Sequence, residues 1–215
     1  MRSWISLVGL AAASAAAQAQ PTRGAAPAPG PSFDCTAAGS AVENMICTDD
    51  RLRAMDLGLE RFYASARRGP QARRVLREQR TWLARRNACA NRACLYEALT
   101  DRLWDLSESV GRDLPAYEND SDAGTLVIVP LGGEWYAFGV LGIWEGPPVT
   151  SAAVGGAFRL QGGRARVPRG NPMACDHSLV RLPGDRWQIV GHPNAERVSC
   201  GAFNISIEGT YVRRR

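Results

Sequence analysis

The sequence predicts an α+β protein in which an N-terminal, disulfide-stapled α-helical hairpin domain is followed by a small antiparallel β sandwich or barrel. Three observations support this fold class. Apolar residues recur every three or four positions between residues 48 and 111, which is the helical period. After residue 124 the apolar residues fall in short β-type runs between turns. The six cysteines are an even number in a chain that starts like an exported protein, which indicates disulfides rather than metal ligands.

The first residues are typical of a secretory signal. Arg2 precedes an apolar, alanine-rich run that starts at Trp4, and an Ala-x-Ala cleavage pattern ends at Ala19. We expect residues 1–19 to be a signal peptide and the protein to be periplasmic or secreted. Residues 20–32 are rich in Pro, Ala and Gly without a period, which predicts a flexible leader. Export argues against nucleic acid as a partner, and no other segment predicts membrane insertion after signal cleavage.

Positive charge is concentrated in one part of the chain. Loss of Arg2 with the signal peptide leaves 25 bases against 21 acids, a net charge of +4. Residues 60–92 alone carry ten arginines and two glutamates, and the whole chain has no lysine. We therefore expect this region to attract anions.

Residues 33–112 are predicted to form the helical domain. A first helix, from about Thr48 to Ala66, starts with N-cap residues. Gly69 and Pro70 then break the helix, and a second helix runs from Pro70 to about Cys89. A third helix ends near residue 111. The apolar stripes are Leu52, Met55, Leu59, Phe62 and Ala66 in the first helix, and Leu95, Leu99, Leu103 and Leu106 in the third.

The cysteine pairing can be predicted from the helical rise of about 1.5 Å per residue. Cys47 lies 22 residues before Gly69, and Cys89 lies 19 residues after Pro70. In an antiparallel hairpin these two cysteines sit at nearly the same height. The predicted pairs are therefore Cys47–Cys89, Cys35–Cys94 and, in the β part, Cys175–Cys200.

The stretch "QRTWLARRNAC", residues 79–89, raises the question of a binding site. Its spacing places Gln79, Trp82 and Arg86 on one helix face, together with Cys89. Asp56 falls on the apolar stripe of the first helix, within about one turn of the height of Arg86. A guanidinium can hold such a carboxylate in two hydrogen bonds, which makes a buried charge tolerable. We interpret Asp56, Gln79, Trp82 and Arg86 as a polar seam between the two helices, with a ligand site as the alternative.

The remaining chain is predicted to be a linker and a β domain. Residues 113–124, "DLPAYENDSDAG", are acidic and rich in turn residues, and they lack the spacing of an EF-hand calcium loop. Residues 125–215 carry β-type runs from "TLVIVPL" to "FNISIEGTYV", and "LPGDRW" is a turn between two of them. Phe203, Ile205 and Ile207 alternate with polar residues, which predicts a strand with one buried face.

The helical region resembles a known family. The motifs "SFDC", "VENMIC", "DDRLRAMDLGLERFY" and "QRTWLARRNAC" are similar, in order and spacing, to those of the lysozyme inhibitor LprI-like N-terminal domain family. The match covers about residues 32–106, with Met55 where Leu is usual and Asn87 where Asp is common. The late "CG" and "EGTY" resemble the β tail of some members. The resemblance implies a periplasmic or cell-surface protein and, for some members, inhibition of lysozyme.

Two binding functions follow as hypotheses. The first is a secreted binding module that blocks the cleft of a lysozyme or another peptidoglycan hydrolase, whose working groups are two carboxylates. The second is an envelope factor that binds anionic cell-surface polymers. Both would use the arginines near the hairpin tip, although a solvated helix face also explains any single arginine. The candidate binding residues are Arg67, Arg68, Arg73, Arg74 and Arg77.

Catalysis is not predicted. The sequence has no G-x-S-x-G, no H-E-x-x-H and no phosphate-binding glycine loop. Asp176, His177 and Ser178 are contiguous, and neighbours on a strand point to opposite faces, so they are poorly placed for a catalytic relay. We expect no catalytic residue, no metal and no cofactor.

Overall fold

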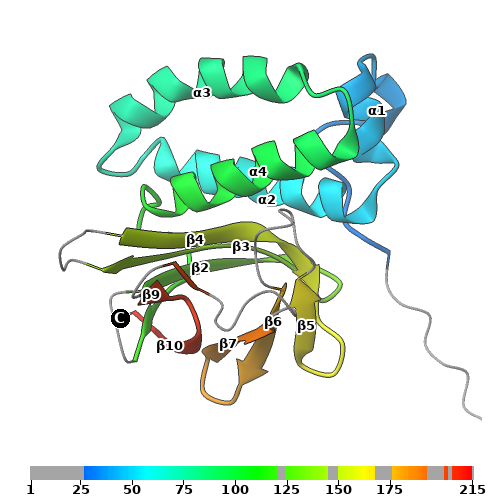
Figure 1. Cartoon of the computed structure of the whole chain (residues 1–215). Coiled ribbons are helices and arrows are strands. Elements are labelled where there is room, and N and C mark those ends of the chain that lie inside the picture. The colour runs from blue at the N-terminus through cyan, green and yellow to red at the C-terminus, as the bar shows by residue number, and fades with distance from the viewer. Residues whose placement is uncertain are drawn as a thin grey trace, which may run out of the picture.

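The structure is a computed structural model that describes residues 27–120, 124–144, 150–167, 176–192, 201–202 and 205–214. Within these ranges the predicted α+β class is confirmed, because α-helices lie against a curled antiparallel sheet (Figure 1). The predicted signal peptide and the predicted Cys175–Cys200 pair lie outside the described residues. No described helix is long and apolar enough to cross a membrane.

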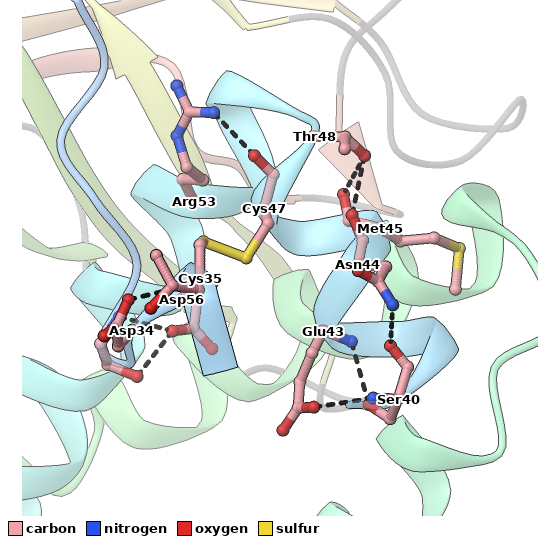
Figure 2. The surroundings of a disulfide bond; sticks show 12 residues. Asp34, Cys35, Ser40, Glu43, Asn44, Met45, Cys47, Thr48, Arg53 and Asp56 are labelled. Atoms are coloured by element: carbon pink, nitrogen blue, oxygen red, sulfur yellow. Dashed lines mark hydrogen bonds between the residues drawn. A yellow bond between two sulfur atoms is a disulfide. The ribbon is translucent and has the colours of Figure 1, made fainter. Parts of the chain in front are cut away.

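The predicted helices correspond to α2, α3 and α4, and α1 is an additional short helix. Ser40 and Glu43 form a capping box at the start of α1: the Glu43 backbone N–H donates to Ser40 Oγ, and the Ser40 backbone N–H donates to Glu43 Oε2 (Figure 2). Asp49 caps α2 through the backbone N–H groups of Arg51 and Leu52. The helical elements are η1 (Cys35–Ala37), α1 (Ala41–Cys47), α2 (Asp50–Ala66), α3 (Ala72–Asn87) and α4 (Arg92–Ser107).

The β part forms one antiparallel sheet with the strand order β4-β3-β2-β1-β10-β7-β6-β5. The sheet curls until its two end strands, β4 and β5, are joined by the short turn 160–163. Its strands are β1 (Ala116–Asn119), β2 (Gly124–Gly132), β3 (Trp135–Trp144), β4 (Thr150–Arg159), β5 (Arg164–Val167), β6 (Asp176–Leu182), β7 (Arg186–His192) and β10 (Gly209–Arg213). A separate two-stranded sheet pairs β8 (Gly201–Ala202) with β9 (Ile205–Ser206).

The two faces of the curled sheet bury different residues. The strand period of two directs Leu126 and Ile128 of β2 into the interior of the sheet, with Phe138, Trp187 and other apolar residues. Val127 and Val129 point to the other face and pack with α2 and α4. Helices and sheet therefore share one core. The predicted boundaries of the two domains remain a prediction.

Small residues let the helices approach the sheet closely. A side chain at Gly58 of α2 would meet the Cβ atom of Ala137 at 2.1 Å, so no larger residue fits there without moving the helix. At Gly155 of β4, a Cβ atom would lie 2.6 Å from the Thr100 carbonyl oxygen of α4. Figure 1 accordingly shows α2 and α4 directly on the sheet and α3 farther away.

Two expectations about local structure need correction. The acidic segment 113–124, expected to be a linker, contributes β1 to the middle of the sheet, because Tyr117 buries its ring in the interior of the sheet. The final β-type run divides into β9 and β10, and Phe203 lies outside the described residues. Ile207 is buried between β9 and β10, and the predicted alternation stays a prediction because the side chains of Phe203 and Ile205 lie outside the described part.

The predicted cysteine pairing in the helical region is wrong. The disulfides are Cys35–Cys47 and Cys89–Cys94, with Cα–Cα distances of 5.8 and 5.5 Å. Cys47 ends α1, a helix separated from α2 by a cap, so the rise along α2 does not fix its height relative to α3. Each bridge instead joins segments close in sequence, and Figure 2 shows the first bridge between η1 and α1.

Candidate functional site

The candidate site is α3, a helix that lies away from the sheet, beyond α2 and α4 (Figure 1). Trp82 and Gln79, expected to face the first helix, instead face α4. Trp82 Nε1 donates to the Ala98 carbonyl oxygen at 3.1 Å, and Gln79 Oε1 accepts from Arg102 Nη2 at 3.0 Å. The seam of α3 is thus formed mainly with α4.

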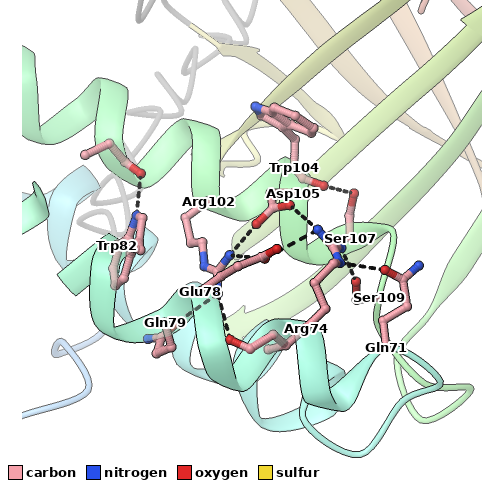
Figure 3. A network of polar contacts seen from close by, with 12 residues as sticks. Gln71, Arg74, Glu78, Gln79, Trp82, Arg102, Trp104, Asp105, Ser107 and Ser109 are labelled. Carbon is pink, nitrogen blue, oxygen red and sulfur yellow. Dashed lines mark hydrogen bonds and ion pairs between the residues drawn. The ribbon is translucent and has the colours of Figure 1, made fainter.

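A buried arginine organises this seam (Figure 3). The Arg102 side chain is 4 % exposed and pairs with Asp105 on its own helix and, at 3.6 Å, with Glu78 of α3. Its guanidinium also lies 6.0 Å from the ring centroid of Trp82. Several partners share the one buried charge, which is the condition under which such burial is tolerated.

The predicted pair of Asp56 and Arg86 is present but looser than expected. Arg86 Nη1 lies 3.8 Å from Asp56 Oδ1, an ion-pair distance without a hydrogen bond. The two hydrogen bonds to the buried carboxylate come from Ser32, whose backbone N–H and hydroxyl donate to Asp56 Oδ2 at 2.8 and 2.6 Å. Arg86 instead donates to Asn87 Oδ1 and lies over the Trp82 ring. The reason is that α3 packs on α4, which keeps Arg86 at the margin of α2.

Two of the five predicted binding arginines form ion pairs with other side chains of the protein. Arg68 pairs with Asp113 at 2.8 Å, and this carboxylate also accepts from Ser65. Hydrogen bonding by Ser65, followed in effect by Arg68, lowers the pKa of Asp113. Arg74 donates to Ser109 at 2.8 Å and lies 3.2 Å from Asp105 (Figure 3). These contacts hold the α2–α3 turn against the segment that follows α4.

The other three predicted arginines, Arg67, Arg73 and Arg77, are exposed and make no ion pair with a described residue. Arg80, one turn after Arg77, is equally exposed and unpaired within the described part of the chain. Residues three apart on a helix are neighbours, so the spacing from Arg77 could have predicted Arg80 as a further candidate binding residue. Arg67 is the C-cap residue of α2, whereas the spacing of Arg73, Arg77 and Arg80 places them on one side of α3, and we call these three the arginine face.

The start of α3 adds to the positive potential of this face. Gln71, the N-cap residue, makes no capping hydrogen bond, and the first turn has no acidic residue. The N–H groups and the dipole of the helix start therefore add partial positive charge near Arg73. Leu76, 51 % exposed, lies between the arginines and is one of the few large apolar side chains at the described surface.

The possible catalytic residues are arranged differently from their order in the sequence. His177 points toward the interior of the sheet, while Ser178 Oγ lies 2.7 Å from Nε2 of His192 on the neighbouring strand. Ser178 is only 3 % exposed, so its hydroxyl is poorly placed to meet a substrate. Asp176, on the same face, pairs with Arg166 at 2.8 Å. This geometry is that of a structural hydrogen bond. Among the described residues, no group of three or more His, Cys, Asp or Glu side chains could hold a metal ion.

Comparisons with known proteins find partial relatives. Lipoprotein LprI of Mycobacterium tuberculosis and Lipoprotein LprI of Mycobacterium bovis are each 32 % identical to this chain over 109 residues, which cover 48 % of the chain and 55 % of the relative. The chain thus spans about half the length of the curated relatives it matches. No family model matches the chain, and no solved structure matches it.

Proposed function

We propose that this protein is an exported, non-catalytic binding protein that blocks a lysozyme-type muramidase with the arginine face of α3. The observation that carries the proposal is the set of exposed guanidiniums on one helix that form no ion pair with a described residue. The similarity to Lipoprotein LprI supports it, together with the resemblance of the helical motifs to the lysozyme inhibitor LprI-like N-terminal domain family. The signal-like first residues support export.

The spacing of the arginines suits such a target. Arg73 and Arg77 are four residues apart, so they stand about 6 Å apart along the helix axis. The two working carboxylates of a retaining glycosidase are about 5–5.5 Å apart. One guanidinium can bind one carboxylate in two parallel hydrogen bonds. Two arginines in register could therefore engage both carboxylates of the cleft.

Leu76 gives this contact an apolar part. It lies next to Arg77 and is 51 % exposed, so a partner could bury it between the two ion pairs. Interfaces are strongest where an apolar or aromatic anchor is buried and water is excluded from the neighbouring polar contacts. Buried contacts of this kind lose little strength when salt is added, whereas exposed charge pairs are screened.

A second function is supported by the same charge distribution. A cationic face slows the approach of a cationic lysozyme, whereas it speeds the approach of an anionic polymer. Arg73, Arg77 and Arg80 lie on one side of α3, whose first turn has no compensating acid. The alternative function is therefore binding of anionic envelope polymers, such as phosphate-bearing glycans. This binding should weaken steeply with ionic strength.

The experiment that separates the two functions is lysis of a peptidoglycan suspension by a c-type lysozyme, with and without a molar excess of the protein, at low and at moderate salt. The proposal predicts dose-dependent inhibition that persists at moderate salt. Inhibition at low salt alone would favour a screened, polymer-like interaction. Absence of inhibition at both salt concentrations would contradict the muramidase proposal, and a polyanion binding assay would then test the alternative.

A further inference from the structure

A cleft of about 880 Å³ lies beyond the end of α4, on the helix-facing side of the sheet. Its floor consists of side chains that are neighbours on three adjacent strands. Ala116 of β1 is opposite Val127 of β2, and Thr125 of β2 is opposite Leu141 of β3. Directly opposed residues lie on the same face of a sheet, so these four share one face. Val127 is fully buried there, and the exposed part of the floor comes from Ala116, Thr125 and Leu141.

The cleft exists because α4 ends before it covers this part of the sheet. The helix stops at Ser107, and the chain continues past the cleft through Val110 and Leu114 to β1. Val110 and Leu114 line the cleft, and both are only half-buried, as are Ala116 and Leu141. Val110, Leu114 and Ala116 also pack against the core, so the cleft offers a ligand the part of these side chains that stays exposed.

The charged residues of the cleft are mostly positive. Arg112, Arg213 and Arg214 line it, against the single carboxylate of Glu108. Arg112 is exposed and has no hydrogen bond or ion pair with a described side chain. Arg214 pairs with Glu118 at 2.7 Å, but both side chains are more than half exposed, so this pair is weak. Arg112 is thus available to an anionic group at the mouth of the cleft.

We propose that this cleft binds an amphiphile with a single alkyl chain and an anionic head group. The apolar floor would bury the chain, and the guanidinium of Arg112 would bind the head group. A volume of about 880 Å³ falls within the range of about 300–1,000 Å³ that is usual for small-molecule sites. A carboxylate and a phosphate present the same acceptor geometry to a guanidinium, so either head group satisfies the site.

This site is separate from the arginine face in its chemistry. The arginine face projects charge into solvent from a helix surface, whereas the cleft combines apolar walls with charge at its mouth. Pro70, at the turn between α2 and α3, lines the cleft and places it near the hairpin tip. The inference does not depend on the proposed function, and each can fail without the other.

The test is isothermal titration calorimetry of the full protein with dodecanoate and with dodecyl phosphate, both below their micelle concentrations. We expect saturable 1:1 binding of at least one of them. Octanoate should bind at least tenfold more weakly than dodecanoate, since each buried methylene contributes about fourfold in affinity. Dodecyltrimethylammonium, with the same chain length and the opposite charge, should bind at least tenfold more weakly. A cationic amphiphile that binds equally well would overturn the proposal, as would the absence of saturable binding.

Two variants locate the site. Arg112→Glu should weaken dodecanoate binding about tenfold, while Arg164→Glu, at an exposed position of β5, should leave it unchanged. Thr125→Trp should fill the floor and abolish binding, with Val180→Trp on β6 as its matched control. If circular dichroism shows that Thr125→Trp does not fold, the affinity of Arg112→Glu for dodecanoate still tests the proposed site. Unchanged affinity in Arg112→Glu would contradict the proposed site.

Discussion

The helices that lie on the sheet and the helix that lies away from it are held by different forces. Among their own residues, α2 buries nine of 17 and α4 seven of 16, whereas α3 buries two of 16. The first two helices are therefore fixed by apolar burial and close backbone approach. The third depends on Val75, Trp82 and a polar network centred on Arg102.

This difference indicates how a polar helix can expose charged side chains and still pack against the rest of the protein. On the inner side of α3, Arg74 binds Asp105 of α4 and Ser109 after it, whereas the guanidiniums on the outer side form no ion pair with a described residue. Structural and available arginines alternate along the same helix. Arg74 is a structural residue, and its neighbour Arg73 is available. Substitutions should therefore separate stability from binding within one helix.

The largest expected effect is at Trp82. Trp82→Ala should lower the free energy of unfolding by about 3–5 kcal/mol, because it removes the main apolar contact of α3 and its hydrogen bond to α4. The control is Leu76→Ala on the outer side, which should change stability by less than about 0.5 kcal/mol. Urea unfolding followed by circular dichroism measures both. Equal losses would show that the two sides of α3 do not differ.

The disulfides should rank next. Cys35→Ala with Cys47→Ala opens a bridge between residues 12 apart and should cost about 3 kcal/mol. Cys89→Ala with Cys94→Ala opens one between residues five apart and should cost about 2 kcal/mol, with the faster hydrogen exchange confined to α3 and its junction with α4. Thermal unfolding and amide exchange test the ranking. A larger loss from the second pair would mean that α3 is tied to the core more tightly than its burial indicates.

A loss similar to that of the second disulfide is expected at the buried arginine. Arg102→Ala should lower stability by about 2 kcal/mol, since it leaves Gln79 Oε1 without its donor and leaves Asp105 with Arg74 as its remaining partner. Arg102→Met, which keeps an apolar stem beside Trp82, should recover part of that loss. The matched surface variant Arg73→Ala should be neutral within about 0.5 kcal/mol. If Arg102→Ala proves as neutral as Arg73→Ala in urea unfolding, the network does not hold α3.

The smallest effect concerns pH. Hydrogen bonding to Ser65, with a contribution from Arg68, lowers the pKa of Asp113 below its ordinary value of 3.8. The carboxylate therefore stabilises the fold at and above that pH, and this contribution is lost as the pH falls through the lower, folded-state pKa. Asp113→Asn should make the loss of melting temperature between pH 5 and pH 3 shallower. The change is small because Asp113 is 45 % exposed. An unchanged pH dependence would show that Asp113 does not couple the turn to the rest of the fold.

Much of the fold could be predicted because strong periodicity reports burial. The stripe Leu95, Leu99, Leu103 and Leu106 is buried as predicted, and α2 begins at its predicted cap. The turn in "LPGDRW" joins β6 and β7 as expected, with Asp185 in the left-handed conformation. The Ser40-to-Glu43 capping box was also present in the sequence, although a helix as short as α1 carries little periodic signal.

The tertiary contacts could be predicted less well, because they depend on which helices are neighbours. The pairing of Cys47 with Cys89 assumed that Cys47 belongs to the helix that packs on α3. The same assumption directed Trp82 toward α2, whereas it faces α4. A single sequence gives the faces of a helix but not its partner. The sequence also does not show which arginines form ion pairs. That depends on where Asp105, Ser109 and Asp113 lie in the fold.

The most direct test of the proposed function is the affinity of the protein for immobilised c-type lysozyme at moderate salt. The double variant Arg73→Glu/Arg77→Glu would be compared with Arg164→Glu/Arg186→Glu, which has the same charge change at exposed positions of the sheet. We expect the first to weaken binding at least tenfold with unchanged melting temperature, and the second to change it less than twofold. Equal weakening by both variants would show that only net charge matters, and this result would contradict a binding role of α3.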